Sequence, residues 1–72
     1  MNIKCIGWIS SLAETREMNI PVENPDQLKN ILPFSIEGKD SMIIIVNNQP
    51  GSPESVVSNE DHVVLLPVIS GG

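Results

Sequence analysis

The sequence has little of what several classes of protein depend on. It has a single cysteine, Cys5, so no internal disulfide can form. Its 4 Lys+Arg against 9 Asp+Glu give a formal charge of −5, which makes nucleic acid and anionic membrane surfaces poor partners and a basic protein surface a better one. No stretch approaches the roughly 20 apolar residues of a membrane span, and the first residues lack the apolar centre of a signal peptide. We therefore expect a cytosolic protein with no nucleic-acid or membrane partner.

Side chains that could carry catalysis are scattered along the sequence. His62 stands beside Asp61 with no second histidine or cysteine nearby, which disfavours a metal site. The serines have no acid–base partners at a useful spacing, and the sequence has no glycine-rich phosphate loop. A chain of this length buries only about 60% of its unfolded surface, too little for a roomy cleft. We interpret Cys5 as a small buried apolar residue and expect no permanently bound cofactor.

The most informative feature that is present is the pair Gly71-Gly72, at which the sequence ends. At about 7% glycine per position, a glycine pair is expected there in roughly 0.5% of chains. The pair follows an apolar run over residues 63–70 that is typical of a core strand leading into a tail. A carboxylate on two glycines has no side chain near it, so it can enter a narrow channel. We expect Gly72 to be the natural end of the chain and its carboxylate to be the reactive group.

Hydrophobic patterning predicts two strands in the first third of the chain. Residues 3–9 are rich in apolar side chains, and Gly7 among them indicates a bulge or a close contact. After a turn over residues 12–15, apolar and polar residues alternate over residues 17–23, as in a half-buried strand. Pro21 cannot donate a ladder hydrogen bond, so we expect this second strand at a sheet edge.

A short helix is predicted next. Asn24 is a good N-cap and Pro25 suits the first helical position. Apolar residues at positions 28, 31 and 32 then fall on one helical face. Pro33 ends the helix early, so it must be brief.

Three more strands are predicted after the helix, over residues 42–46, 55–57 and 62–66. A hairpin followed by a helix that crosses to further strands is the β-grasp arrangement. We therefore predict an α+β fold, with a mixed sheet of four to five strands and one main helix packed on one face. The β-grasp domain would cover residues 1–67, and residues 68–72 would form a flexible C-terminal tail.

Three segments resemble the MoaD/ThiS family of sulfur carriers, most closely its MoaD branch. They are Leu-Ala-Glu-Thr-Arg-Glu at residues 12–17, Ile-Val-Asn at 45–47, and the ending Asp-His-Val-Val-Leu-Leu-Pro-Val-Ile-Ser-Gly-Gly at 61–72. The resemblance implies a ubiquitin-like β-grasp fold. It also implies a C-terminal glycine that an E1-like enzyme adenylates with ATP and that sulfur transfer converts to a thiocarboxylate.

In the MoaD branch the tail inserts into the large subunit of molybdopterin synthase and donates sulfur to a pterin precursor. Carried over to this sequence, the adenylate and thiocarboxylate form at Gly72. The residues expected to bind partners are Gly71, Ser70, Ile69, Val68, Leu66 and Ile6. Leu65 and Leu66 fall on opposite faces of a strand, and the face without a helix offers an apolar docking patch. The resemblance to the family implies that Leu66 is the one in this patch. The chain would then be a protein cosubstrate or small synthase subunit, not an enzyme on its own.

Other readings stay open at this point. Within the family, the chain could be the sulfur carrier for thiamine thiazole, with thiazole synthase as its partner. The proline and serine placement in residues 66–72 favours the MoaD branch. Outside the sulfur carriers, it could be a ubiquitin-like modifier joined through Gly72 to lysines of target proteins. It could also be a β-grasp interaction domain with an inert tail.

Overall fold

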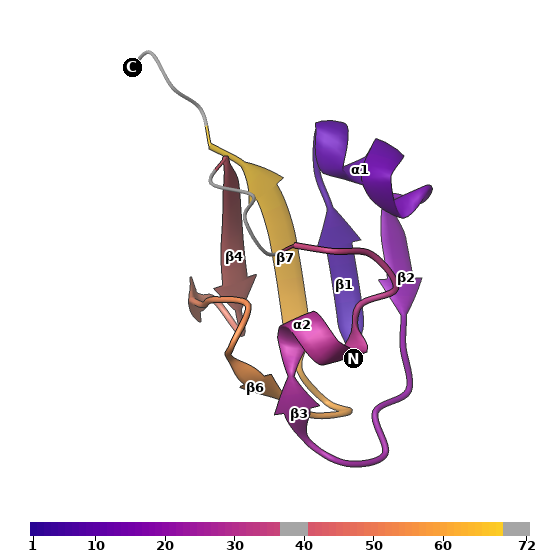
Figure 1. Ribbon diagram of the computed structural model, residues 1–72, viewed down its shortest axis with the longest axis vertical. Coiled ribbons are helices and arrows are strands. Elements are labelled where there is room, and N and C mark those ends of the chain that lie inside the picture. The colour runs from indigo at the N-terminus through magenta and orange to yellow at the C-terminus, as the bar shows by residue number, and fades with distance from the viewer. Residues whose placement is uncertain (37–40, 69–72) are drawn as a thin grey trace.

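The computed structural model describes residues 1–36 and 41–68 (Figure 1). In chain order its elements are β1 (Asn2–Cys5), α1 (Trp8–Ala13), β2 (Glu17–Asn19), β3 (Asp26–Gln27), α2 (Leu28–Ile31), β4 (Met42–Val46), β5 (Gln49–Pro50), β6 (Val56–Val57) and β7 (His62–Pro67). The last four residues lie outside the described part, so the predicted division between domain and tail stays a prediction.

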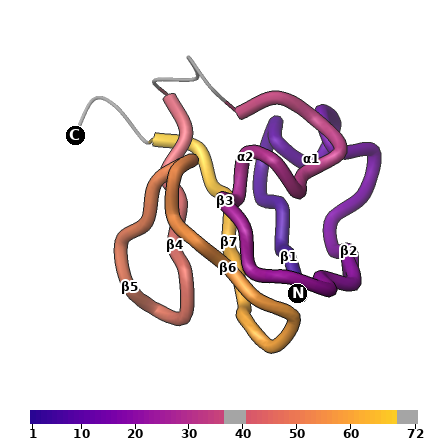
Figure 2. Tube along the Cα trace, turned by 60° about the horizontal axis from the view of Figure 1, so that its bottom comes forward, coloured from indigo at the N-terminus to yellow at the C-terminus, as the bar shows by residue number. Residues whose placement is uncertain are grey.

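A five-stranded mixed sheet organises the molecule, with strand order β2-β1-β7-β4-β5. β1 and β7 run parallel at its centre, while β2 pairs antiparallel with β1 and β4 pairs antiparallel with β7. The last strand therefore lies between the first strand and β4, which is the β-grasp arrangement that the element order predicts. The predicted fold class is confirmed. The two short strands β3 and β6 lie side by side in a separate sheet (Figure 2).

One face of the central strands forms the core. The register pairs Ile3 with Val63 and Cys5 with Leu65, and Leu65 in turn with Ile44, so these side chains share a face. All five are buried, and Leu65 and Ile3 are fully so. The same apolar cluster takes in Ile9 of α1, Leu28 of α2 and Val57 of β6. The helices and the small sheet thus cover one face of the main sheet. The structure also bears out the prediction that Cys5 is buried.

The predicted first strand is too long. β1 ends at Cys5, and residues 8–13 form α1, where the sequence predicts more strand and then a turn. Gly7 separates the two elements with φ 64° and ψ −139°, a backbone conformation that other L-residues rarely adopt. The apolar residues on its two sides therefore do not belong to one strand. The chain turns only after α1 ends, at Glu14, whose backbone φ is 62°.

The predicted helix begins too early. α2 starts at Leu28 with Gln27 as its N-cap, and no side-chain oxygen caps it. Asp26 and Gln27 instead pair with β6, an interaction that the Asn24-Pro25 signal cannot reveal. The amides of Leu28 and Lys29 donate to loop carbonyls of Ser55 and Pro53, each at 2.9 Å. The predicted end is correct, because Leu32 before Pro33 is extended.

The remaining strands follow the predictions more closely. β4 matches the predicted residues, β6 lies within the predicted short strand, and β7 starts as predicted but continues to Pro67. β2 occupies the sheet edge, as Pro21 indicates, although it ends at Asn19. Neither helix in the described residues is long and apolar enough to cross a membrane.

The burial of neighbouring leucines on opposite faces gives a stability test. Leu65 is fully buried and Leu66 is only partly buried. We expect Leu65→Ala to lower the free energy of unfolding by about 3 kcal/mol, because the cavity would lie in the centre of the core. Leu66→Ala should cost about 1 kcal/mol. Urea unfolding of both variants measures the difference. Equal losses would contradict the assignment of the two faces.

Candidate functional site

The end of β7 is the part of the structure from which the glycine pair follows. Of the predicted site residues, Ile6, Leu66 and Val68 are described, whereas Ile69, Ser70, Gly71 and Gly72 lie outside the described residues. The chain passes from the sheet into those last four residues at Val68. The site that can be built here is therefore the support from which the predicted tail departs.

Both neighbouring strands hold the end of β7. On the β4 side, the Val68 amide donates to the Ser41 carbonyl at 2.8 Å. On the β1 side, the Ile6 amide donates to the Leu65 carbonyl at 2.9 Å. Beyond Ile6, the Pro67 ring packs directly on Gly7. Helix α1 begins at this point and lies at the same end of the sheet as the C-terminal end of β7 (Figure 1).

The face of the sheet opposite the core carries apolar residues at this same end. Leu66 is opposite Ile43 in the β4–β7 register. On the β1 side of β7, Ile6 lies at the level of Leu66. The register pairs Cys5 with Leu65, and the Ile6 amide donates to the Leu65 carbonyl. Ile6 is 48% exposed, Ile43 39% and Val68 43%. We call these four residues, Ile6, Ile43, Leu66 and Val68, the apolar end of the open face.

Sequence reasoning missed Ile43 and the exposed side of α1. Ile43 lies in a continuous apolar run, which does not by itself tell which residues face outward. Its pairing with Leu66 would have been the signal, because paired residues share a face. In α1, Trp8 is 41% and Leu12 37% exposed, one helical turn apart on the same side. The wrong assignment of residues 8–13 to strand and turn hid this pair.

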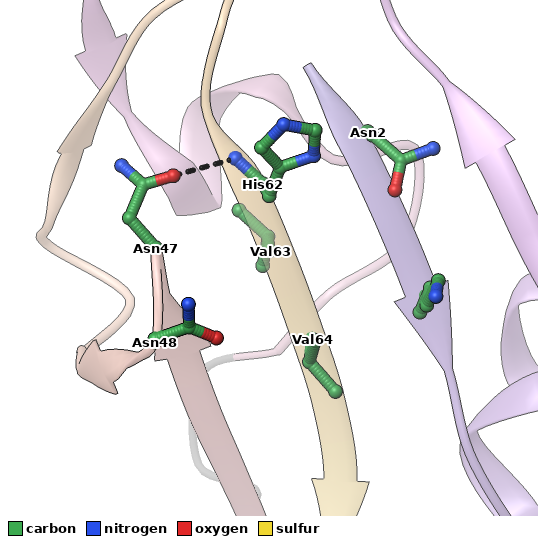
Figure 3. A pocket seen from close by; sticks show the side chains of 7 residues that line it. Asn2, Asn47, Asn48, His62, Val63 and Val64 are labelled. Carbon is green, nitrogen blue, oxygen red and sulfur yellow. Dashed lines mark hydrogen bonds between the residues drawn. The ribbon is translucent and has the colours of Figure 1, made fainter.

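The other end of the open face is polar. A shallow pocket of about 360 Å³ lies there, lined by Asn2, Lys4, Asn47, Asn48, His62, Val63 and Val64 (Figure 3). Several of its polar groups already bond within the protein. Asn2 donates to Glu17 at 3.0 Å, and the Asn47 side-chain oxygen accepts the His62 amide at 2.9 Å. These side chains fasten neighbouring strands and turns rather than converge on a common point.

Among the described residues, side chains suited to acid–base or nucleophilic chemistry do not assemble into a catalytic group. Burial raises the pKa of the Cys5 thiol, which keeps it protonated and a poor nucleophile. His62 is exposed, as expected for a lone surface histidine. Within residues 1–36 and 41–68, no three His, Cys, Asp or Glu side chains gather as metal ligands would. The described part therefore offers surfaces and a supported strand end.

Two solved structures share this architecture. The crystal structure of SAMP1 from Haloferax volcanii superposes with a TM-score of 0.72 at 17% sequence identity, covering 100% of this chain and 98% of that one. The solution structure of the small archaeal modifier protein 1 (SAMP1) from Methanosarcina acetivorans gives 0.65 at 18% identity, covering 99% and 94%. The chain has the ubiquitin-like β-grasp fold of SAMP1. At these identities the likeness shows the fold alone. The sequence matches no protein-family model and no curated protein.

Asp61 ties the turn before β7 to the turn after β4. Its carboxylate accepts a hydrogen bond from the Asn47 side chain at 3.0 Å and from the Ser58 amide at 2.7 Å. These bonds, with that from Asn47 the stronger influence, lower the pKa of Asp61 below its ordinary value. A carboxyl with a lowered folded-state pKa stabilises the fold above its unfolded pKa. That stability is lost as the pH falls through the folded-state value.

Replacing Asp61 tests this link. We expect Asp61→Asn to lower the free energy of unfolding at pH 7 by about 1 kcal/mol, a modest value because solvent screens the carboxylate. The difference from the unaltered protein should shrink as the pH falls below about 4, where the unfolded carboxyl becomes protonated. Thermal unfolding across this pH range measures it. The control is Glu60→Gln, since the exposed Glu60 side chain makes no hydrogen bond to a described residue. An equal loss in that control would contradict the assignment.

Proposed function

We propose that the chain is a sulfur carrier protein whose Gly72 carboxylate is activated by an E1-like adenylating enzyme. The observation that carries the proposal is the position of Gly71-Gly72, four and five residues beyond the end of β7. That strand end is held on both sides and bordered by an exposed apolar surface. A β-grasp fold supports the proposal, because the resemblance to the MoaD/ThiS family implies it. The tail would supply the reactive group, and the open face would supply the docking surface.

The proposed chemistry has two steps. A Gly72 carboxylate oxygen attacks the α-phosphate of ATP, which forms the acyl adenylate and releases pyrophosphate. Hydrosulfide, or the persulfide of a sulfur donor, then attacks the carbonyl carbon and AMP leaves. Hydrosulfide gives the thiocarboxylate directly, whereas a persulfide gives an acyl disulfide, which a thiol reductant cleaves to the thiocarboxylate and the donor thiol. Splitting acyl transfer in this way replaces a poor leaving group by a good one. The activating enzyme would supply the phosphate contacts, and a net charge of −5 favours a basic surface on it.

We propose molybdopterin biosynthesis as the pathway and the large subunit of molybdopterin synthase as the sulfur-accepting partner. The support is the sequence of residues 66–72, whose proline and serine placement resembles the MoaD branch. Sulfur transfer to thiamine thiazole is the alternative within the family. In either pathway the chain acts as a protein cosubstrate, and ATP is a substrate of the activating enzyme.

A second candidate function is protein modification. In this case the same Gly72 adenylate would be attacked by a lysine amine of a target protein, forming an isopeptide bond as AMP leaves. The observation that favours it is the fold likeness to a structure described as a small archaeal modifier protein. Conjugates joined through Gly72, detected by mass spectrometry of peptides from cell extracts, would distinguish modification from sulfur transfer alone.

Pyrophosphate exchange tests the activation step. We expect a matching E1-like enzyme to catalyse ATP–pyrophosphate exchange only when this protein is present. Deleting Gly72, or appending one alanine after it, should lower the exchange rate by about a hundredfold or more, because the carboxylate is then misplaced by one residue. Full exchange with the appended variant would contradict Gly72 as the reactive position.

Charge introduced at the apolar end of the open face tests docking. We expect Ile6→Asp to weaken binding to the activating enzyme about tenfold or more, because a carboxylate would be buried without a partner in the complex. Isothermal titration calorimetry measures the affinity. The matched control is Val56→Asp, since Val56 is 65% exposed and lies in the small sheet. Equal weakening by both variants would indicate a general effect of negative charge and would contradict this docking surface.

A further inference from the structure

Gly7 is the residue against which the end of β7 rests. A methyl group built on Gly7 would lie 3.0 Å from Cγ and 3.3 Å from Cδ of the Pro67 ring. Contacts this close require the Pro67 ring to shift by a few tenths of an ångström before a side chain fits. Val68, the next residue, is bonded to Ser41 on the opposite side. Because Pro67 and Val68 are adjacent in the chain, we expect a displacement of Pro67 to disturb the Val68–Ser41 hydrogen bond.

The backbone at Gly7 has the mirror image of a common conformation. Its φ of 64° and ψ of −139° are unfavourable for an L-residue. With both signs reversed, they fall close to the polyproline II region, one of the most favourable for L-residues. A D-residue would therefore adopt the observed conformation without strain. An L-residue would have to rotate the backbone between β1 and α1, which lies against Pro67.

We propose that Gly7 is a positioning residue: it fixes the direction in which the backbone leaves the sheet at Pro67 and Val68. This inference rests on the proposed function, in which the segment carrying Gly72 must enter the activating enzyme. A strand end held in one direction before binding leaves less conformational freedom to be lost on binding. Gly7 acts on the reaction through Pro67, at a distance from the carboxylate.

The experiment compares L-alanine and D-alanine at position 7. Cys5 allows the chain to be made by chemical ligation of a short N-terminal peptide to the synthetic remainder. We expect Gly7→Ala to raise KM for the carrier in ATP–pyrophosphate exchange about fivefold, with kcat within about twofold, because binding must then reorder the strand end. The D-alanine protein should keep KM within about twofold of the unaltered protein, because its backbone is unstrained.

Amide hydrogen exchange at Val68 gives a readout that needs no enzyme. We expect exchange at Val68 to be about tenfold faster in Gly7→Ala and unchanged in the D-alanine protein, since only the first disturbs the bond to Ser41. The control for general destabilisation is Gly51→Ala, whose added methyl would lie 2.8 Å from Cγ2 of Val46, on the β4–β5 hairpin. That variant should lose stability yet keep the KM of the unaltered protein.

Equal KM values and equal Val68 exchange for the L- and D-alanine proteins would overturn the proposal. An increase in KM for Gly51→Ala as large as for Gly7→Ala would also overturn it, since any loss of stability would then have the same effect. If the unaltered protein supports no ATP–pyrophosphate exchange with any E1-like enzyme, the proposed function fails. Val68 hydrogen exchange then decides alone whether Gly7 fixes the strand end.

Discussion

The parallel pairing of the first and last strands is the interaction on which the rest of this structure depends. Ile3 lies beside Val63 and Cys5 beside Leu65, so two strands nearly a whole chain apart form the centre of the core. Contacts between segments so far apart in the sequence form only when the chain between them has folded back, which costs conformational entropy. The elements between β1 and β7 bring the two strands together. β2 then completes one side of the sheet and β4 the other. The C-terminal end of β7 is thereby held in place by residues near the N-terminus of the chain.

This pairing also divides the sheet into two unlike faces. The covered face receives α1, α2 and β6, because each contributes a buried apolar residue to the cluster around Leu65. The open face is polar where β7 begins and apolar where it ends. Each property follows from the alternation of side chains along β7 and from the residues opposite it. The proposed function needs both features at one place: an apolar surface for docking, and a strand end from which a tail can be presented.

Much of the fold could be predicted from sequence, and the failures have physical causes. Residues 42–46 and the start of β7 carry strong strand patterns, and the element order was enough to indicate a β-grasp fold. The sequence pattern predicts too long a first strand because apolar residues continue through Gly7, where the backbone takes a positive φ and the strand ends. The Asn24-Pro25 signal predicts too early a helix start because pairing between β3 and β6, separated by about thirty residues, overrides it. Patterns within a short window contain no information on such pairings.

The candidate site was predictable in part for the same reasons. Period-two alternation correctly separates Leu65 from Leu66, and the structure brings Ile6 and Val68 to the same end of the sheet as Leu66. Ile43 and the Gly7–Pro67 contact depend on register between strands, which the sequence alone does not provide. The central claim concerns the Gly72 carboxylate, and the intact mass of the protein tests it most directly. After incubation with ATP, an E1-like enzyme and a sulfur donor, the account predicts the mass gain of one oxygen replaced by one sulfur, absent when Gly72 is deleted. An unchanged mass with a series of demonstrably active E1-like enzymes, or the same gain without Gly72, would contradict it.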